Sequence, residues 1–563
     1  MNPLLFGVLL AAVGPAPADL ILTRGAVYTV DPARSWAEAV AIRGGRIVYV
    51  GTDLGVRPYR GPRSRVVDLG GRMLLPGFQD AHVHPVTSGI QLGQCDLSDL
   101  PAREALLAKV ATCAEGDPRA PWIQGAGWLM SSFPGGIPTR DALDAIAPDR
   151  PVYLESADGH SAWVNSRALA LAGITRDTPD PTNGRIERDA TTGEAVGTLQ
   201  ESATELVSRL TPEPSLDVRL AGLGRALQKL NGWGLTALQE ANAGGGPKGG
   251  GRSILETYQA AERRGTLSAR VTVALGTDAA RGPEQVDDLV RLRREFMGRR
   301  VRPTAAKIFA DGVLESHTAA MLAPYLDRPG ESGRPNLEPQ ALDALVTRLA
   351  GADFDVHIHA IGDRAVRISL DALEAAAAPA TRTRRHQIAH LELVQPEDVP
   401  RFRRLGVIAN FQPLWGYADD YITDLTWPLI GPERSRRLYP IGELARSGAV
   451  VAFGSDWSVS SANPLEGIQV AVTRESVSAP RRPPLLPEQA IDLPTALAAY
   501  TIGAAYANRL DAETGSIEVG KAADLVVLSK NVFEVDPHEI AEVKVVLTLL
   551  EGQAVYQDPA WAW

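Results

Sequence analysis

The chain has 563 residues, of which 45% are hydrophobic and 22% are charged. This length exceeds one ordinary domain and accommodates a barrel of roughly 250 residues together with additional domains. The composition indicates neither a membrane protein nor a disordered chain. The net charge is −10 and no basic stripe is present, so we do not expect a nucleic-acid partner.

An apolar stretch opens the chain, from Leu4 to Val13, and Ala16-Pro17-Ala18 follows it. This order is typical of a signal peptide with its cleavage site, so we assign residues 1–18 to a signal peptide and expect a periplasmic or secreted protein without membrane insertion after cleavage. The stretch is short and no Lys or Arg precedes it. The alternative is a cytoplasmic enzyme whose N-terminus is disordered or β-paired.

Only two cysteines are present, Cys95 and Cys113, which excludes a zinc site of four thiolates. If the protein is exported, oxidising conditions favour a disulfide between the two cysteines. The alternative is two buried free thiols, since cysteine is often simply packed in the interior.

The two ends of the chain share one pattern, which consists of short apolar strands separated by turns that contain glycine. Residues 19–73 and 509–563 show this pattern, whereas the middle of the chain alternates strand-like and helix-like segments. We therefore predict that the two ends pair into one small β-sandwich domain beside a central α/β domain.

Eight short apolar runs in the centre are candidates for buried parallel strands, which are almost continuously hydrophobic. The runs are MLLPGFQDAHVH, GLTALQEA, ARVTVALG, TAAKIFADG, DFDVHIHA, RHQIAH, GVIANFQP and AVVAFGSD. Eight βα units predict a (β/α)8 TIM barrel, with its first strand in residues 74–94 and the others in residues 215–508. About 150 residues separate the first two strands, more than one crossover needs, so we predict an inserted subdomain over residues 95–214.

Residues of the kind that bind metals follow several of these strands. His82 and His84 lie at i and i+2 of a strand, which places both imidazoles on one face at the end where barrel active sites lie. An isolated pair of this kind is weak evidence, but six of the nine histidines cluster at three strand ends. The further ligand-type residues are Lys307, Asp311, His357, His359, His386, His390 and Asp456. Nitrogen and oxygen donors without thiolate suit Zn²⁺ and also tolerate Mn²⁺, Fe²⁺, Co²⁺ or Ni²⁺.

The predicted insertion contributes Trp122, Trp128, Asp158 and His160. His160 is a candidate to reach over the barrel mouth as a contact for the substrate or its oxyanion. The alternative is a histidine that fixes the fold of the insertion, and the tryptophans are more often core residues than a substrate platform.

The run LLPGFQDAHVHP resembles the first-strand signature of the amidohydrolase superfamily. The runs KIFADGVLESHTAAMLAPY, HIHAIGDRAV and FGSDWSV are similar to its YtcJ-like branch, and the resemblance covers nearly the whole chain. His317 stands where close relatives often have an arginine, and Ala389 stands where an acidic residue is frequent. These two departures concern substrate contacts rather than the metal site.

The resemblance implies a centre with one or two divalent metals, most plausibly zinc. The implied ligands are His82, His84, a carboxylated Lys307, His359, His390 and Asp456, which is also the implied base. A carbamate is an anionic oxygen donor, whereas an ammonium group would be repelled by the metal. The alternative for Lys307 is a salt bridge to Asp311. In each later histidine pair we choose the second residue because it lies nearer the C-terminal end of its strand.

The resemblance implies hydrolysis of a small-molecule C–N bond outside peptides, in an N-acyl amine, a formamide or a cyclic amide, by metal-activated water. The alternatives are an ester or carbamate hydrolase on the same site, and a metal-binding or signalling barrel without turnover. The sequence does not name the substrate, and it leaves the oligomeric state open, a homodimer included.

Overall fold

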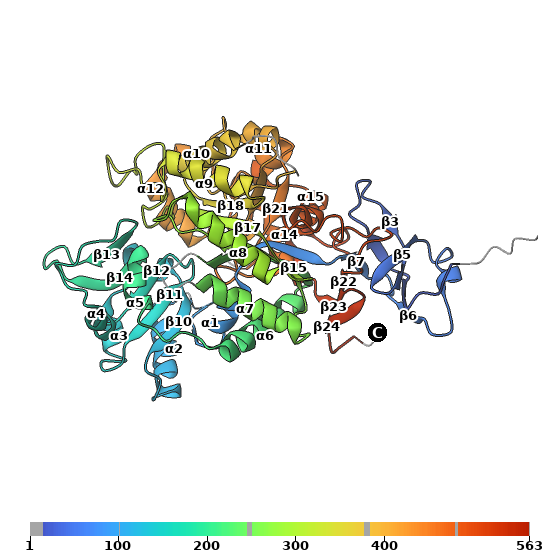
Figure 1. The fold of residues 1–563 in the computed structure, drawn as a ribbon, viewed down its shortest axis with the longest axis horizontal. Helices are drawn as coiled ribbons and strands as arrows, with labels where there is room; N and C mark the ends of the chain where they lie inside the picture. The colour runs from blue at the N-terminus through green and yellow to red at the C-terminus, as the bar shows by residue number, and fades with distance from the viewer. Residues whose placement is uncertain are drawn as a thin grey trace, which may run out of the picture.

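The computed structural model describes residues 15–98, 100, 102–244, 250–376, 383–478 and 482–561. Figure 1 shows a barrel in the middle, an inserted subdomain at one end and a small β-domain at the other. Residues 1–14, most of the predicted signal peptide, lie outside the described residues. No helix in the described part of the chain is long and apolar enough to cross a membrane.

The barrel is a sheet of eight parallel strands, one in each apolar run selected from the sequence. The strands are β8 (Phe78–Val83), β15 (Leu235–Gly244), β16 (Arg270–Gly276), β17 (Val301–Phe309), β18 (Asp355–Ala360), β19 (Gln387–His390), β20 (Ile408–Phe411) and β21 (Val451–Phe453). The ladder runs in chain order from β8 to β21. The predicted TIM barrel is therefore confirmed.

Helices connect and cover these strands, as Figure 1 shows for α6 to α11. The helices of the barrel are α1 (Pro85–Gln91), α6 (Leu216–Gly232), α7 (Gly250–Arg263), α8 (Val286–Phe296), α9 (Pro339–Gly351), α10 (Asp363–Ala375), α11 (Val399–Leu405), α12 (Trp427–Ser435), α13 (Ile441–Arg446), α14 (Pro464–Thr473), α15 (Leu493–Ala498) and α16 (Ala504–Ala507). Except for α12 and α16, their apolar faces and the barrel strands together form the largest hydrophobic core among the described residues.

Hydrogen bonds beyond the ends of two strands bring the first and the last strand of the barrel together. The Asp456 N–H donates to the His82 carbonyl at 2.7 Å, and the His84 N–H donates to the Trp457 carbonyl at 3.1 Å. The Asn410 amide of β20, the strand before the last, also donates to the Ala81 carbonyl of β8 at 2.9 Å. These contacts nearly close the barrel, and they place His82, His84 and Asp456 beside one another.

Both ends of the chain build the small β-domain, as expected, from two sheets packed on a shared apolar core. One sheet holds β1 (Leu20–Thr23), β4 (Ala39–Arg43), β5 (Arg46–Gly51) and β6 (Arg65–Asp68). The other holds β2 (Ala26–Tyr28), β3 (Trp36–Ala37), β7 (Met73–Pro76), β22 (Leu525–Leu528), β23 (Val545–Leu550) and β24 (Gln553–Gln557). The antiparallel pairing of β7 with β22 joins the two ends of the chain. The first apolar run thus serves two domains, because it supplies both β7 and β8.

The insertion follows the first barrel strand and has its own six-stranded sheet and its own core. Its strands are β9 (Cys95–Asp96), β10 (Ile123–Trp128), β11 (Val152–Ser156), β12 (Ser161–Val164), β13 (Gly184–Arg188) and β14 (Ala195–Glu201). Its helices are α2 (Arg103–Gly116), α3 (Arg140–Asp144), α4 (Ser166–Ala172) and α5 (Glu205–Ser208). A disulfide between Cys95 and Cys113 ties β9 to α2.

The insertion and the sandwich lie at opposite ends of the barrel strands. Tyr421, in a segment that follows β20, donates a hydrogen bond to Asp158 of the insertion at 3.1 Å, so the insertion covers the C-terminal ends. Arg270, the first residue of β16, donates to Asp524 of the sandwich at 2.6 Å. The sandwich therefore supports the N-terminal ends.

Candidate metal centre

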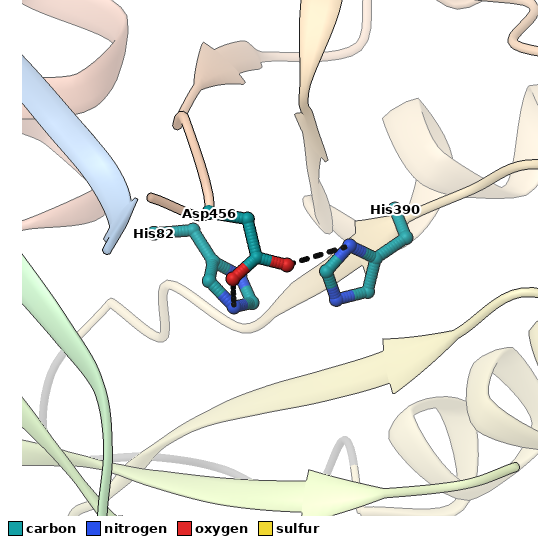
Figure 2. A group of neighbouring side chains, drawn as sticks. All are labelled: His82, His390 and Asp456. Carbon is teal, nitrogen blue, oxygen red and sulfur yellow. Dashed lines mark ion pairs between the residues drawn. The ribbon is translucent and has the colours of Figure 1, made fainter. Parts of the chain in front are cut away.

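Asp456 is the point on which three histidines converge. Its Oδ1 lies 3.2 Å from Nε2 of His84 and 3.7 Å from Nε2 of His82. Its Oδ2 lies 3.8 Å from Nδ1 of His390, and Figure 2 shows the carboxylate between the rings of His82 and His390. The ligand atoms of His82, His390 and Asp456 all lie within 4.8 Å of one another, close enough to hold one ion.

The protonation states within this cluster suit a cation. Burial lowers the pKa of His82 and of His390 well below the usual value, so both imidazoles are neutral, the form that binds metals. Burial by itself would raise the pKa of Asp456, but a hydrogen bond with His84 and nearby charges lower it, so the carboxylate is ionised. His82 and His390 therefore offer lone pairs, and Asp456 offers a negative charge, to one point. Burial by itself would lower the pKa of His84, but hydrogen bonds with Asp456 and Glu240 raise it to about 9, so His84 must lose a proton before it can bind a metal.

Lys307 is the fourth group at this point. Its side chain is buried, and its Nζ lies 3.3 Å from Nε2 of His82. Burial lowers the pKa of Lys307 to about 7, an effect that the Asp456 carboxylate partly opposes. A large fraction of the side chain is thus a neutral amine near neutral pH. The alternative salt bridge is not found among the described residues, in which Asp311 accepts backbone N–H groups instead, for example from Gly362 at 2.9 Å.

His359 and His390 form the other side of the cluster, with ring centroids 4.6 Å apart. Both side chains are buried, and among the described residues the Nδ1 of neither makes a hydrogen bond. Nδ1 of His359 lies 3.4 Å from Oδ1 of Asp311, and Nδ1 of His390 lies 3.8 Å from Oδ2 of Asp456. Buried ring nitrogens without a hydrogen bond, in a cluster of nitrogen and oxygen donors, fit a metal centre of the kind that zinc occupies.

The other members of the two later histidine pairs have different surroundings. Nε2 of His357 lies 2.9 Å from Nδ1 of His82, so His357 supports that ring from behind. Nδ1 of His386 accepts a hydrogen bond from the Val356 N–H at 3.0 Å, within the barrel wall. His359 and His390 are thus the members of their pairs whose rings face each other in the cluster.

The insertion brings His160 to the same place. Its ring centroid lies 5.5 Å from that of His359, and its Nδ1 lies 3.0 Å from Oε2 of Glu201. Burial by itself lowers the pKa of His160, but the Glu201 carboxylate raises it to about 9. At neutral pH an imidazolium therefore stands over the cluster. The same glutamate accepts a hydrogen bond from Thr318 at 2.7 Å, which links the insertion to the segment after β17.

Other residues singled out in the sequence lie elsewhere. Trp128 is fully buried and Trp122 partly buried in cores of the insertion, so both are packing residues. Nε2 of His317 lies 2.8 Å from Oδ2 of Asp327, a residue outside the cluster of candidate ligands.

Sequence reasoning missed two supports of the cluster. Nδ1 of His84 lies 3.3 Å from Oε1 of Glu240, a buried residue of β15. The Trp415 ring stacks on His390, with centroids 5.5 Å apart and an interplanar angle of 6°. A signal for Glu240 was present, because a charged residue within a buried apolar strand needs a partner. No comparable signal marked Trp415.

Comparisons with known proteins give consistent matches over most of the chain. The model of the amidohydrolase family matches residues 65–556. The chain is 30% identical to the putative amidohydrolase YtcJ of Bacillus subtilis, over 95% of this chain and 98% of that protein. It is 28% identical to the N-substituted formamide deformylase of Arthrobacter pascens, over 96% of this chain and 98% of that protein. The crystal structure of an uncharacterized metal-dependent hydrolase from Pyrococcus horikoshii matches with a TM-score of 0.72 and 26% identity, over 92% of this chain and 99% of that one.

Proposed function

Because the chain belongs to the amidohydrolase family, whose members include hydrolases of C–N bonds, we propose that it hydrolyses a small-molecule amide outside peptides. The substrates we propose are N-acyl amines, N-substituted formamides and cyclic amides. The observation that carries the proposal is the convergence of His82, His84 and His390 on Asp456 at the C-terminal end of the barrel. The similarity to a formamide deformylase supports this substrate class.

We propose that the centre holds one or two divalent ions, with Zn²⁺ as the first candidate. The proposed ligands are His82, His84, Lys307, His359, His390 and Asp456. When bound, the metal supplies hydroxide at neutral pH and polarises the substrate carbonyl. The neutral amine of Lys307 can attack the carbon of CO₂ and lose a proton, which gives a carbamate with two oxygen donors.

Two residues of the chain move or stabilise charge in the proposed reaction. The ionised Asp456 carboxylate accepts the proton of the attacking water and passes it to the leaving nitrogen, so that the amine departs neutral. The His160 imidazolium stands ready to donate a hydrogen bond to the oxyanion or to a substrate oxygen, with Glu201 holding the other edge of its ring. The insertion thereby contributes to a site that is otherwise built by the barrel.

The experiment that tests this proposal changes Asp456 to Asn, which keeps the size and one oxygen donor but removes the base. The metal content of purified protein should fall only modestly. The hydrolysis rate on a panel of N-substituted formamides, N-acetyl amines and cyclic amides should fall by about 10² to 10⁴, the usual contribution of a positioned acid or base. The exposed Asp177→Asn variant serves as the control. A near-normal rate in Asp456→Asn would show that another residue is the base. If the wild type hydrolyses only the matched esters, the substrate is an ester rather than an amide.

A further inference from the structure

Three side chains form a line from the outside of the barrel to the metal cluster. Tyr258 of α7 donates a hydrogen bond from its hydroxyl to Oε2 of Glu240 at 2.9 Å. Oε1 of Glu240 lies 3.3 Å from Nδ1 of His84. The opposite nitrogen of His84, Nε2, lies 3.2 Å from Oδ1 of Asp456. The line thus connects a helix, a barrel strand and the proposed ligand.

Tyr258 and Glu240 are buried, so the oxygens of Glu240 need hydrogen-bond partners within the protein. Tyr258 is completely buried and Glu240 is 1% exposed. A carboxylate in such surroundings costs free energy unless hydrogen bonds satisfy its oxygens, and here one oxygen faces Tyr258 and the other faces His84. Carboxylate oxygens face both nitrogens of His84, Glu240 at Nδ1 and Asp456 at Nε2, so without a metal the ring carries a hydrogen on each nitrogen. A metal at the cluster would take the place of the hydrogen on Nε2, whereas Glu240 would hold the hydrogen on Nδ1.

His82 provides an internal comparison, because it lies on the same strand but is supported differently. Its Nδ1 faces the imidazole of His357 at 2.9 Å. The partner of His82 is therefore another imidazole, whereas the partner of His84 is the carboxyl group of Glu240. A carboxylate partner makes an imidazole a stronger electron donor to a metal.

We propose that Glu240, held in place by Tyr258, is a positioning residue that fixes the ring orientation and the tautomer of His84 for metal binding. This inference rests on the proposed function, because it requires His84 to be a ligand. Glu240 itself does not touch the substrate or the metal in this assignment. Its contribution is the geometry and electron donation of His84.

The test measures metal affinity rather than turnover. The full-length protein is stripped of metal and titrated with Zn²⁺ in competition with a chelator, and its visible spectrum is recorded after loading with Co²⁺. Glu240→Gln keeps the shape but removes the charge, and it should weaken Zn²⁺ binding about 10- to 100-fold and change the Co²⁺ spectrum. Tyr258→Phe removes one hydroxyl and should weaken binding by a smaller factor. Glu513→Gln is the matched control, because Glu513 accepts hydrogen bonds from Arg302 at the opposite end of the barrel strands, so its Zn²⁺ affinity should equal that of the wild type.

Wild-type affinity and an unchanged Co²⁺ spectrum in Glu240→Gln would overturn the inference. If that variant does not fold, as judged by circular dichroism, Tyr258→Phe decides, and an unchanged affinity in Tyr258→Phe would then overturn it. A wild-type protein that binds no Zn²⁺ would instead overturn the proposed function together with this inference. The two failures are therefore distinguishable.

Discussion

Glu551 of the sandwich forms ion pairs with arginines at the N-terminal end of the barrel strands. Replacing Glu551 should therefore lower the free energy of unfolding. Arg299 donates to both of its carboxylate oxygens at 2.8 and 3.2 Å, Arg300 donates to Oε2 at 2.7 Å, and Arg270 donates to Oε1 at 3.2 Å. Burial by itself would raise the pKa of Glu551, but these hydrogen bonds and charges lower it from 4.5 to about 2. A shift of this size corresponds to at most about 3.4 kcal/mol. Since the side chain is 25% exposed and solvent screens the pairs, we expect about 1–2 kcal/mol.

The change is Glu551→Gln, and the assay is urea unfolding followed by circular dichroism. A carboxyl whose pKa is lowered on folding stabilises the protein above its unfolded pKa, and the stabilisation disappears as the pH falls from about 4.5 to about 2. The variant should therefore unfold at lower urea than the wild type at neutral pH, and the difference should vanish in strong acid. Glu213→Gln, at an exposed loop position, is the control. Equal stability of Glu551→Gln and the wild type at neutral pH would refute the reasoning.

Three further predictions concern the metal centre, the disulfide and the N-terminus. Lys307→Ala should lose most of its activity and regain part of it when short carboxylic acids are added, because they replace the missing oxygen bridge; full activity without them would make the lysine structural. A thiol assay under denaturing, non-reducing conditions should find no free cysteine, and two reactive thiols would contradict the Cys95–Cys113 bridge. Mass spectrometry of protein from the native host should find Asp19 as the first residue, and an intact Met1 would contradict export.

The barrel was predictable from the sequence because its strands are buried on both faces and therefore appear as apolar runs. The meeting of His82 and His84 with Asp456 was predictable in part, because side-chain alternation places His82 and His84 on one face and because strand ends are where barrel sites lie. One feature of the first run was not predictable. Its division into β7 and β8 depends on the pairing of β7 with β22, from the other end of the chain.

The supports of the site were harder to predict than the ligands. Glu240 meets His84 only because β8 and β15 are adjacent in the barrel, and the sequence alone does not show which residue faces the Glu240 carboxylate. Trp415 has no distinguishing sequence environment, and its role appears only when its ring lies parallel to that of His390. Contacts between residues remote in sequence decide such roles.

The seam between the first and the last strand of the barrel has a consequence for how the protein matures. The backbone of Asp456 bonds to His82 and that of Trp457 bonds to His84, so the atoms that close the barrel belong to the proposed metal ligands or to their neighbours. His82 and His84 are synthesised early, but Asp456 becomes available only when almost the whole barrel has been made. A nascent or truncated chain that lacks β21 therefore cannot assemble this cluster. The cluster of His82, His84 and Asp456 can therefore form only after the whole barrel has been translated and has closed.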